Sequence, residues 1–143
     1  ALMSHTVELD APVAAERLFD YLSDPWTRPD WQSSLRTVVD VHGTGEVGTT
    51  WRDLTAVGAR PAMIVTSAQR PEHWQEAGVW RGLTAHLRLD FTPQGIDRTR
   101  LAVTFGVTGA GVLAPFAAVL QRLAGPAIAA DLRRAVRLAA QQA

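Results

Sequence analysis

Two carboxylates lie in stretches that have the composition of β-strands and share a strand face with bulky apolar side chains. Glu76 alternates with Trp74 and Trp80, and Asp53 has the parity of Trp51. Because side chains two positions apart point to the same face of a strand, both carboxylates are predicted to face an apolar interior. A carboxyl group that loses its water has a raised pKa and suits general acid or base chemistry on an enolisable carbonyl. We identify Glu76 as the first catalytic candidate and Asp53 as the second.

Each carboxylate also has an alternative place in solvent. A shifted strand register or an edge position would leave Glu76 in water. The opposite face of the strand that carries Asp53 holds Leu54 and Ala56, so alternation alone does not decide which of its faces is buried. Either carboxylate would then be an ordinary solvated side chain.

Aromatic and aliphatic side chains near these acids predict a pocket. The chain has five tryptophans and one tyrosine, and the amphipathic indole ring suits a flat or hydrophobic ligand. We place Trp74 and Trp80 on the pocket wall and Trp26 and Trp31 near its mouth, with core packing as the alternative for each ring. The full set of ligand-binding candidates is Trp31, Trp51, Trp74, Trp80, Leu87, Leu89, Phe91, Phe105, Phe116 and Leu120.

The sequence offers little for metal, thiol or phosphate chemistry. It contains no cysteine, which excludes disulfides and thiolate ligands. Two of the four histidines, His73 and His86, fall on neighbouring strands but on the outer face, so we expect no metal site and no cofactor. Residues 43–48 have GxGxxG spacing, yet they join two strands and provide no helix N-terminus to receive a phosphate.

The two acids are carried by a run of predicted strands. Six segments rich in Val, Thr, Trp, Leu and Phe are separated by short turns, which predicts an antiparallel meander. These segments are residues 35–42, 49–57, 62–70, 73–81, 84–91 and 99–107. An earlier strand is predicted over residues 4–10.

The register of the last three strands follows from their turns, because opposite residues of a hairpin have numbers with a constant sum. In the hairpin before residue 91 this rule places Glu76 opposite Leu89. In the next hairpin it places Leu87 opposite Phe105. Three strands then share one apolar face, and the carboxylate of Glu76 lies in that face.

A long helix over residues 112–143 is predicted to cover this sheet. Its apolar residues recur every three to five positions and are Leu113, Phe116, Leu120, Leu123, Ile128, Leu132 and Val136. Its wet face is expected to carry Gln121, Arg122, Asp131, Arg133, Arg134 and Arg137. Gly125 and Pro126 should kink or interrupt it. A shorter helix over residues 13–23 ends at Asp24 and Pro25, which can cap a second short helix running towards Trp31.

Composition limits the function classes. A length of 143 residues fits one domain, residues 1–143, and the formal net charge of zero gives no sign of nucleic acid or an anionic membrane as partner. The longest apolar run, residues 109–120, is too short to span a bilayer. The N-terminus lacks a signal-peptide pattern, so a cytoplasmic location is expected. The sequence leaves a homodimer open.

Several short motifs carry a resemblance to a known family. They are residues 11–14 at the start of the first helix, residues 22–25 followed by 29–31, residues 45–49 before Trp51, and residues 132–138 near the end of the last helix. With the order of elements, they make the chain resemble the START-like (SRPBCC) superfamily, and within it the polyketide cyclase/dehydrase-like family. The resemblance covers nearly the whole chain and is specific for fold.

The resemblance implies an α+β helix-grip fold, also described as START-like or Bet v 1-like. In this fold a curved seven-stranded antiparallel sheet wraps a long C-terminal helix, two short helices follow the first strand, and a deep cavity holds a hydrophobic small molecule. Members include aromatase/cyclases, lipid carriers and hormone-binding proteins, so fold alone does not decide activity.

Three functions fit this sequence. The first is a cyclase or dehydratase-like enzyme acting on a polyketide or similar aromatic intermediate, with Glu76 and Asp53 moving protons. The second is a non-catalytic carrier or sensor of a lipid-like or hydrophobic ligand. The third is a partner-binding module, which would be marked by an exposed apolar patch.

Overall fold

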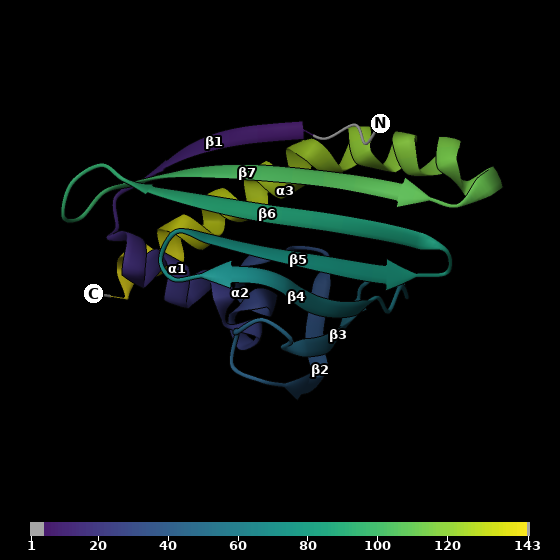
Figure 1. The fold of residues 1–143 in the computed structure, drawn as a ribbon, viewed down its shortest axis with the longest axis horizontal. Coiled ribbons are helices and arrows are strands. Elements are labelled where there is room, and N and C mark those ends of the chain that lie inside the picture. The colour runs from purple at the N-terminus through teal and green to yellow at the C-terminus, as the bar shows by residue number, and fades with distance from the viewer. Residues whose placement is uncertain (1–4, 143) are drawn as a thin grey trace.

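The computed structural model describes residues 5–142. Figure 1 shows one antiparallel sheet with a long helix running along it. The elements are β1 (His5–Ala11), α1 (Ala15–Ser23), the 3₁₀ turn η1 (Pro25–Thr27), α2 (Arg28–Trp31), β2 (Leu35–His42), β3 (Thr50–Thr55), β4 (Ala62–Gln69), β5 (His73–Trp80), β6 (Leu83–Pro93), β7 (Thr99–Gly109), the 3₁₀ turn η2 (Gly111–Leu113) and α3 (Ala114–Gln141). The expected strand start at Ser4 and helix end at Ala143 lie outside the described residues.

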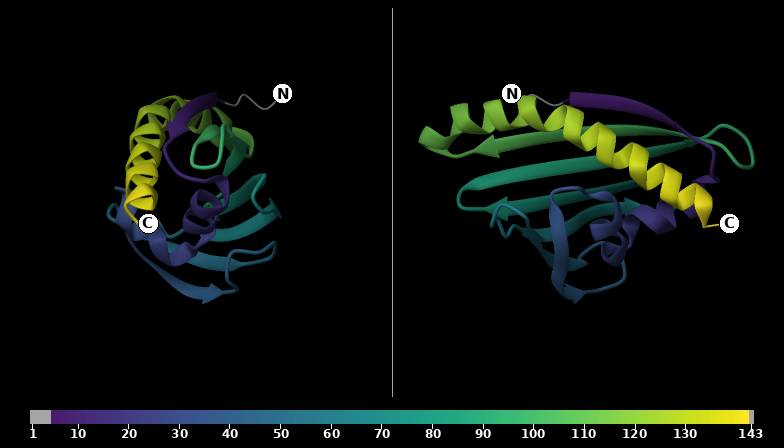
Figure 2. Two further views of the ribbon diagram at one scale, coloured as in Figure 1. Left: turned by 90° about the vertical axis from the view of Figure 1, so that its left-hand side faces the viewer. Right: turned by 180° about the vertical axis from the view of Figure 1, so that it is seen from behind.

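The predicted fold class is confirmed. The seven strands are ordered β1-β7-β6-β5-β4-β3-β2, so the meander from β2 to β7 is completed by β1, which pairs with β7. Figure 2 shows α3 crossing one face of the curved sheet diagonally, with α1 and α2 next to the β3–β5 end of that face. The sheet and the three helices thus enclose one interior.

The predicted register is correct for one hairpin and shifted in the other. Leu87 lies opposite Phe105 in the β6–β7 pair, as predicted. In the β5–β6 pair Glu76 lies opposite Leu87, and not opposite Leu89. The shift is by two residues, so every side chain keeps its face, and Glu76 still points inward.

The shift arises because the turn between β5 and β6 is tighter than expected. Trp80 lies opposite Leu83, which leaves Arg81 and Gly82 as a two-residue turn with φ angles of 50° and 81°. Positive φ at both positions is typical of a type I′ turn, whose twist matches that of the flanking strands.

The short helices after β1 form as the sequence predicts. The backbone N–H of Trp26 donates to Oδ1 of Asp24 at 3.0 Å, and Pro25 occupies the first position of the turn that leads into α2. This cap ends α1 and directs the four residues of α2 towards the sheet. Arg28 and Trp31 are thereby buried beneath the strands.

Helix α3 differs from its prediction in two ways. It continues through Pro126 without a break, because that residue is exposed and the carbonyl freed by proline can be hydrated. Its expected apolar stripe is buried only in the second half: Leu132 is 1 % exposed, whereas Leu123 is 71 % exposed. Gln121, expected in water, is buried, and its Oε1 accepts a hydrogen bond from the backbone N–H of Val107 at 2.9 Å.

The difference follows from where the helix meets the sheet. The first turns of α3 extend past the ends of β6 and β7 (Figure 1), so few of its side chains are buried there. Ala117 and Gln121 are buried, and Leu120 is half-buried. Four large apolar side chains form an exposed face instead: Val112, Phe116, Val119 and Leu123.

By length and composition, residues 111–141 make one helix that could cross a membrane. The longest apolar run predicted from the sequence, residues 109–120, ends before Gln121 and Arg122, whereas the helix continues past them. From Ala129 onward the helix packs its apolar residues against the sheet, as the core helix of this fold does.

We expect Leu132→Ala to lower the free energy of unfolding by about 2–5 kcal/mol, because it removes a fully buried side chain and leaves a cavity. Leu123→Ala, the matched control on the exposed face, should change it by less than about 0.5 kcal/mol. Urea unfolding followed by circular dichroism measures both. Equal losses would mean that the two halves of α3 are buried alike.

Candidate functional site

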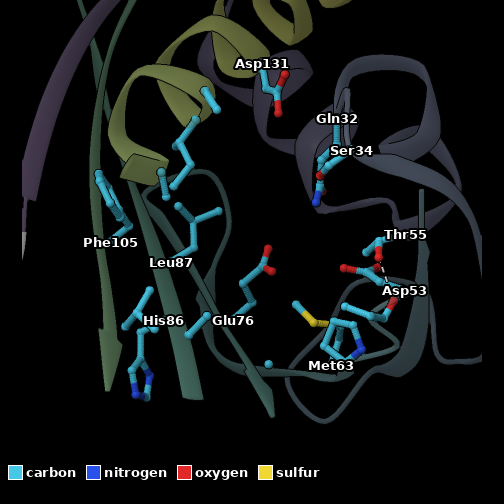
Figure 3. Close-up of a pocket in the computed structure, with 18 of the residues that line it drawn as sticks. Gln32, Ser34, Asp53, Thr55, Met63, Glu76, His86, Leu87, Phe105 and Asp131 are labelled. Atoms are coloured by element: carbon cyan, nitrogen blue, oxygen red, sulfur yellow. Dashed lines mark hydrogen bonds between the residues drawn. The ribbon is translucent and has the colours of Figure 1, made fainter. Parts of the chain in front are cut away.

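A cavity of about 390 Å³ lies between the inner face of the sheet, α2 and α3. Pockets of roughly 300–1,000 Å³ are typical of small-molecule sites. Figure 3 shows that its side chains divide into two groups, apolar ones from the β6–β7 side and polar ones from β3, β5, α3 and the segment after α2. The cavity is therefore amphipathic.

The apolar group comes from strands β5 to β7 and from α3. Its larger members are Trp80, Leu83, Leu87, Phe105, Val107, Leu120, Ile128 and Leu132. The polar group comes from α2, the segment after it, β3, β5 and α3. It comprises Arg28, Gln32, Ser34, Asp53, Thr55, Glu76 and Asp131. A ligand in this space would lay its hydrophobic body on the sheet and turn its polar end towards the second group.

A buried ion pair organises the polar end. Arg28 Nη1 and Nη2 donate to Glu76 Oε1 and Oε2 at 2.7 and 3.0 Å, and the two side chains are 4 % and 5 % exposed. The guanidinium carbon lies 5.4 Å from the ring centroid of Trp31 and 5.1 Å from that of Trp51. Both the edge and the faces of the guanidinium are therefore engaged by protein groups.

The ion pair changes the role expected of Glu76. Burial raises the pKa of Glu76 above its usual range, and the guanidinium of Arg28 opposes that rise. Burial also tends to lower the pKa of Arg28, but Glu76 and Asp53 outweigh it, so the pKa of Arg28 is raised. Because both carboxylate oxygens of Glu76 accept from a guanidinium, Glu76 is the counter-ion of Arg28 and is poorly placed to accept a substrate proton.

Asp53 is the less constrained acid. Its side chain is buried, and Oδ1 accepts a hydrogen bond from Trp51 Nε1 at 2.8 Å. Within residues 5–142, Oδ2 accepts no hydrogen bond and neither oxygen forms an ion pair. Burial raises the pKa of Asp53, while Arg28 and the Trp51 N–H partly offset the rise. The inward parity expected for Asp53 is correct.

The structure divides the predicted ligand-binding residues into two sets. Five of them line the cavity: Trp31, Trp80, Leu87, Phe105 and Leu120. Five do not: Trp51, Trp74, Leu89 and Phe91 are buried in the core, and Phe116 is exposed on α3. Trp26, expected near the mouth, is 62 % exposed and lies outside the cavity lining.

The core tryptophans Trp51 and Trp74 lie on the inner face of the sheet but outside the cavity lining. The rings of Trp51 and Trp74 stack with centroids 6.4 Å apart, and Trp74 Nε1 donates to the carbonyl of Gly45 at 3.1 Å. Alternation placed them on the inner face correctly, but α1 and α2 cover that part of the sheet and fill it. The cavity therefore occupies only the part of the inner face nearer the β5–β6 turn.

Five polar residues of the site were not predicted as site residues: Arg28, Gln32, Ser34, Thr55 and Asp131. Gln32 Oε1 accepts from Arg28 Nη2 at 3.1 Å, and Asp131 Oδ1 accepts from the backbone N–H of Ser33 at 3.2 Å. A signal for Arg28 was present, because a carboxylate predicted to be buried, Glu76, requires a cation. Asp131 was assigned to the wet face of the last helix, and its side chain instead reaches the cavity (Figure 3).

The histidines lie where the sequence placed them. The imidazole of His86 points away from the cavity (Figure 3), and His73 Nε2 is 2.8 Å from Ser67 Oγ. Among residues 5–142, no three His, Asp or Glu side chains are close enough together to hold a metal ion.

The model of one protein family, described as polyketide cyclase / dehydrase and lipid transport, matches residues 2–140 of the sequence. No curated protein matches it. The family match covers nearly the whole chain, including every residue that lines the cavity.

Solved structures with the same fold include enzymes. A START superfamily protein from Mycobacterium smegmatis has a TM-score of 0.79 at 14 % identity, covering 98 % of this chain and 99 % of its own. The ZhuI aromatase/cyclase from Streptomyces sp. R1128 also has 0.79 at 14 % identity, covering 99 % and 96 %. Norcoclaurine synthase from Thalictrum flavum, in complex with dopamine and hydroxybenzaldehyde, has 0.74 at 15 % identity, covering 100 % and 89 %. Such identities support a common fold.

The buried ion pair gives a stability prediction. Glu76→Gln should lower the free energy of unfolding by about 3–5 kcal/mol, because it leaves the charge of Arg28 buried without a counter-ion. The double variant Arg28→Met/Glu76→Leu should recover most of this loss, since it removes both charges. Urea unfolding measures each variant.

The control is the exposed pair of Arg70 and Asp20, whose side chains are 54 % and 57 % exposed. Asp20→Asn should have little effect, because water screens that pair. If Glu76→Gln lowered the free energy of unfolding no more than Asp20→Asn does, the Arg28–Glu76 pair would not hold the polar end of the cavity together.

Proposed function

Because the chain belongs to the polyketide cyclase / dehydrase and lipid transport family, we propose that it binds a hydrophobic, aromatic or polyketide-like molecule in the cavity and transfers a proton on that ligand. Asp53 is the acid–base group of this proposal. The observation that carries it is a buried carboxyl, one oxygen of which has no hydrogen-bond partner among residues 5–142, at the polar end of an otherwise apolar cavity.

The apolar wall supports an aromatic or alicyclic ligand. Trp80, Phe105 and Leu87 come from three adjacent strands and offer a broad hydrophobic surface. Trp31 closes the opposite side beside Arg28. Flat molecules lose little conformational entropy on binding to such a surface.

The proposed step is proton abstraction next to a carbonyl. The Asp53 carboxylate takes a proton from the α-carbon, the electron pair of the C–H bond forms the enolate, and the protonated Asp53 returns the proton to carbon or oxygen. In this step the negative charge passes from Asp53 to the ligand, so the total charge in the cavity does not change. Arg28 also lines the cavity, and its charge is matched by Glu76. No residue of this chain is a lysine, so no lysine side chain is available to form an iminium with the carbonyl.

Glu76 acts in this scheme through Arg28. It holds the guanidinium beside Asp53 and balances its charge, so we assign it as a positioning residue and not as the proton acceptor.

A carrier or sensor without turnover is the second candidate. It is favoured by the apolar lining of the cavity and by the lipid transport role in the family description. The cytoplasmic location, the homodimer and the partner-binding module stay predictions, the last now supported by the exposed apolar face of α3.

Turnover is tested with 2-tetralone, a flat neutral ketone with exchangeable α-protons. In D₂O the protein should accelerate loss of the α-proton NMR signal, and Asp53→Asn should reduce the catalysed rate by about 10²–10⁴-fold, because the base is removed. The amide keeps the acceptor for Trp51 Nε1, so the variant should fold. Asp97→Asn, in the exposed β6–β7 turn, is the matched control and should keep the full rate.

Binding is measured separately with the neutral fluorescent dye N-phenyl-1-naphthylamine. The dye should bind wild-type and Asp53→Asn proteins with similar affinity, since its contacts are with the apolar wall. Dye binding with no α-proton exchange in any form would support the carrier. Absence of dye binding would exclude a hydrophobic ligand site altogether.

The rate of exchange should also depend on pH. Asp53 acts as a base when it is ionised, so the rate should fall as pH decreases through its pKa, which burial raises above the ordinary carboxyl range. Subtracting the rate of Asp53→Asn at each pH removes the background due to solvent. A midpoint at or below the ordinary carboxyl value would argue that another group is the base.

A further inference from the structure

The charges that line the cavity are unequal. Three carboxylates reach it, those of Asp53, Glu76 and Asp131, against one guanidinium, that of Arg28. In Figure 3 the carboxylates of Glu76, Asp53 and Asp131 point into the space from β5, β3 and α3, and the ring of His86 points away from it. Among the described residues, no second Arg side chain lines the cavity.

The single cation is mostly committed to protein groups. Three of its four terminal N–H groups donate to side chains, two to Glu76 and one to Gln32. Nε is buried and has no partner among residues 5–142, so a ligand oxygen cannot reach it without displacing protein atoms. The positive charge of Arg28 is matched by Glu76, which leaves the carboxylates of Asp53 and Asp131 without a counter-ion in the cavity.

The polar end is also rich in hydrogen-bond acceptors. Asp53 Oδ2 has no protein donor within the described part of the chain, and only Oδ1 of Asp131 receives one, from Ser33. Each oxygen of Glu76 accepts a single hydrogen bond and keeps a free lone pair. A ligand carboxylate has only acceptor oxygens and could not hydrogen-bond to these carboxylate oxygens. A hydroxyl or ammonium group on the ligand could donate to them.

We propose that the cavity selects against anions and takes a neutral or cationic hydrophobic molecule whose polar end donates hydrogen bonds, such as a phenol, an alcohol or an amine. The proposal rests on the proposed function, because it assumes that the cavity holds a ligand. It excludes fatty acids and aromatic carboxylates as ligands of this site.

Three probes of matched shape test the charge preference: 2-naphthalenemethanol, 2-naphthylmethylamine and 2-naphthoate. Each is titrated at pH 7 against the wild-type protein loaded with N-phenyl-1-naphthylamine. The alcohol and the amine should displace the dye, and naphthoate should bind at least about tenfold more weakly than the alcohol, which corresponds to about 1.4 kcal/mol. Naphthoate affinity equal to or greater than that of the alcohol would overturn the proposal.

Variants identify the cause. Asp53→Asn/Asp131→Asn should bring naphthoate close to the affinity of the alcohol, and Asp97→Asn should leave the wild-type preference unchanged. Asp131→Asn alone should shift the preference part of the way, and its position on α3 is only half-buried, so it should fold even if the double variant does not. A preference that persists in every folded variant would overturn the proposal.

Dye binding distinguishes a failure of the charge selection from a failure of the hydrophobic site itself. Dye binding with a preference for naphthoate would overturn the charge selection and keep the hydrophobic site. Failure of the dye and of all three probes to bind would overturn both.

Discussion

The ion pair between Arg28 and Glu76 is the constraint on which the rest of the site depends. It joins the short helix α2 to the centre of the sheet, two elements separated by more than forty residues of sequence. Burying two charges is costly, and here the cost is offset by two hydrogen bonds between the side chains and by the rings of Trp31 and Trp51 against the guanidinium. The main effect of the pair is to hold α2 in place against the sheet, and this fixes the polar end of the cavity. Its contribution to net stability is smaller.

The same ion pair gives the two buried acids, Glu76 and Asp53, different roles. A lone buried Glu76 would have been a natural general base, but its two oxygens are used to neutralise Arg28. Asp53 then remains as the buried carboxyl that has a free oxygen, and its own orientation is set by the indole N–H of Trp51. The indole of Trp51 therefore has two contacts in the site. Its ring packs against the guanidinium of Arg28, and its N–H orients the carboxyl of Asp53.

The sequence predicted the fold better than the site, for physical reasons. Alternation and turn chemistry are local, so the strands, their order and the inward face of Glu76 and Asp53 were accessible. The two-residue error in the β5–β6 register was harmless because an even shift keeps each side chain on its face. By contrast, the periodicity of α3 shows which residues share a face but not how far the sheet extends beneath it, so Phe116 was expected inside and is exposed. Arg28 was not predicted as a site residue because arginine is seldom buried. The one signal for it in the sequence is that a buried Glu76 needs a counter-ion.

Desolvation links the proposed chemistry to the proposed ligand. The apolar wall that excludes water from Asp53 raises its pKa and makes it a stronger base when ionised. The same exclusion of water strengthens repulsion between Asp53 and any anion that enters, because charges interact more strongly in a medium of low dielectric constant. A site that used Arg28 to attract an anion would need Glu76 elsewhere, and would then lose the group that fixes α2. Because Glu76 occupies Arg28, the polar end of the cavity offers mainly hydrogen-bond acceptors, and the ligand must supply the donor.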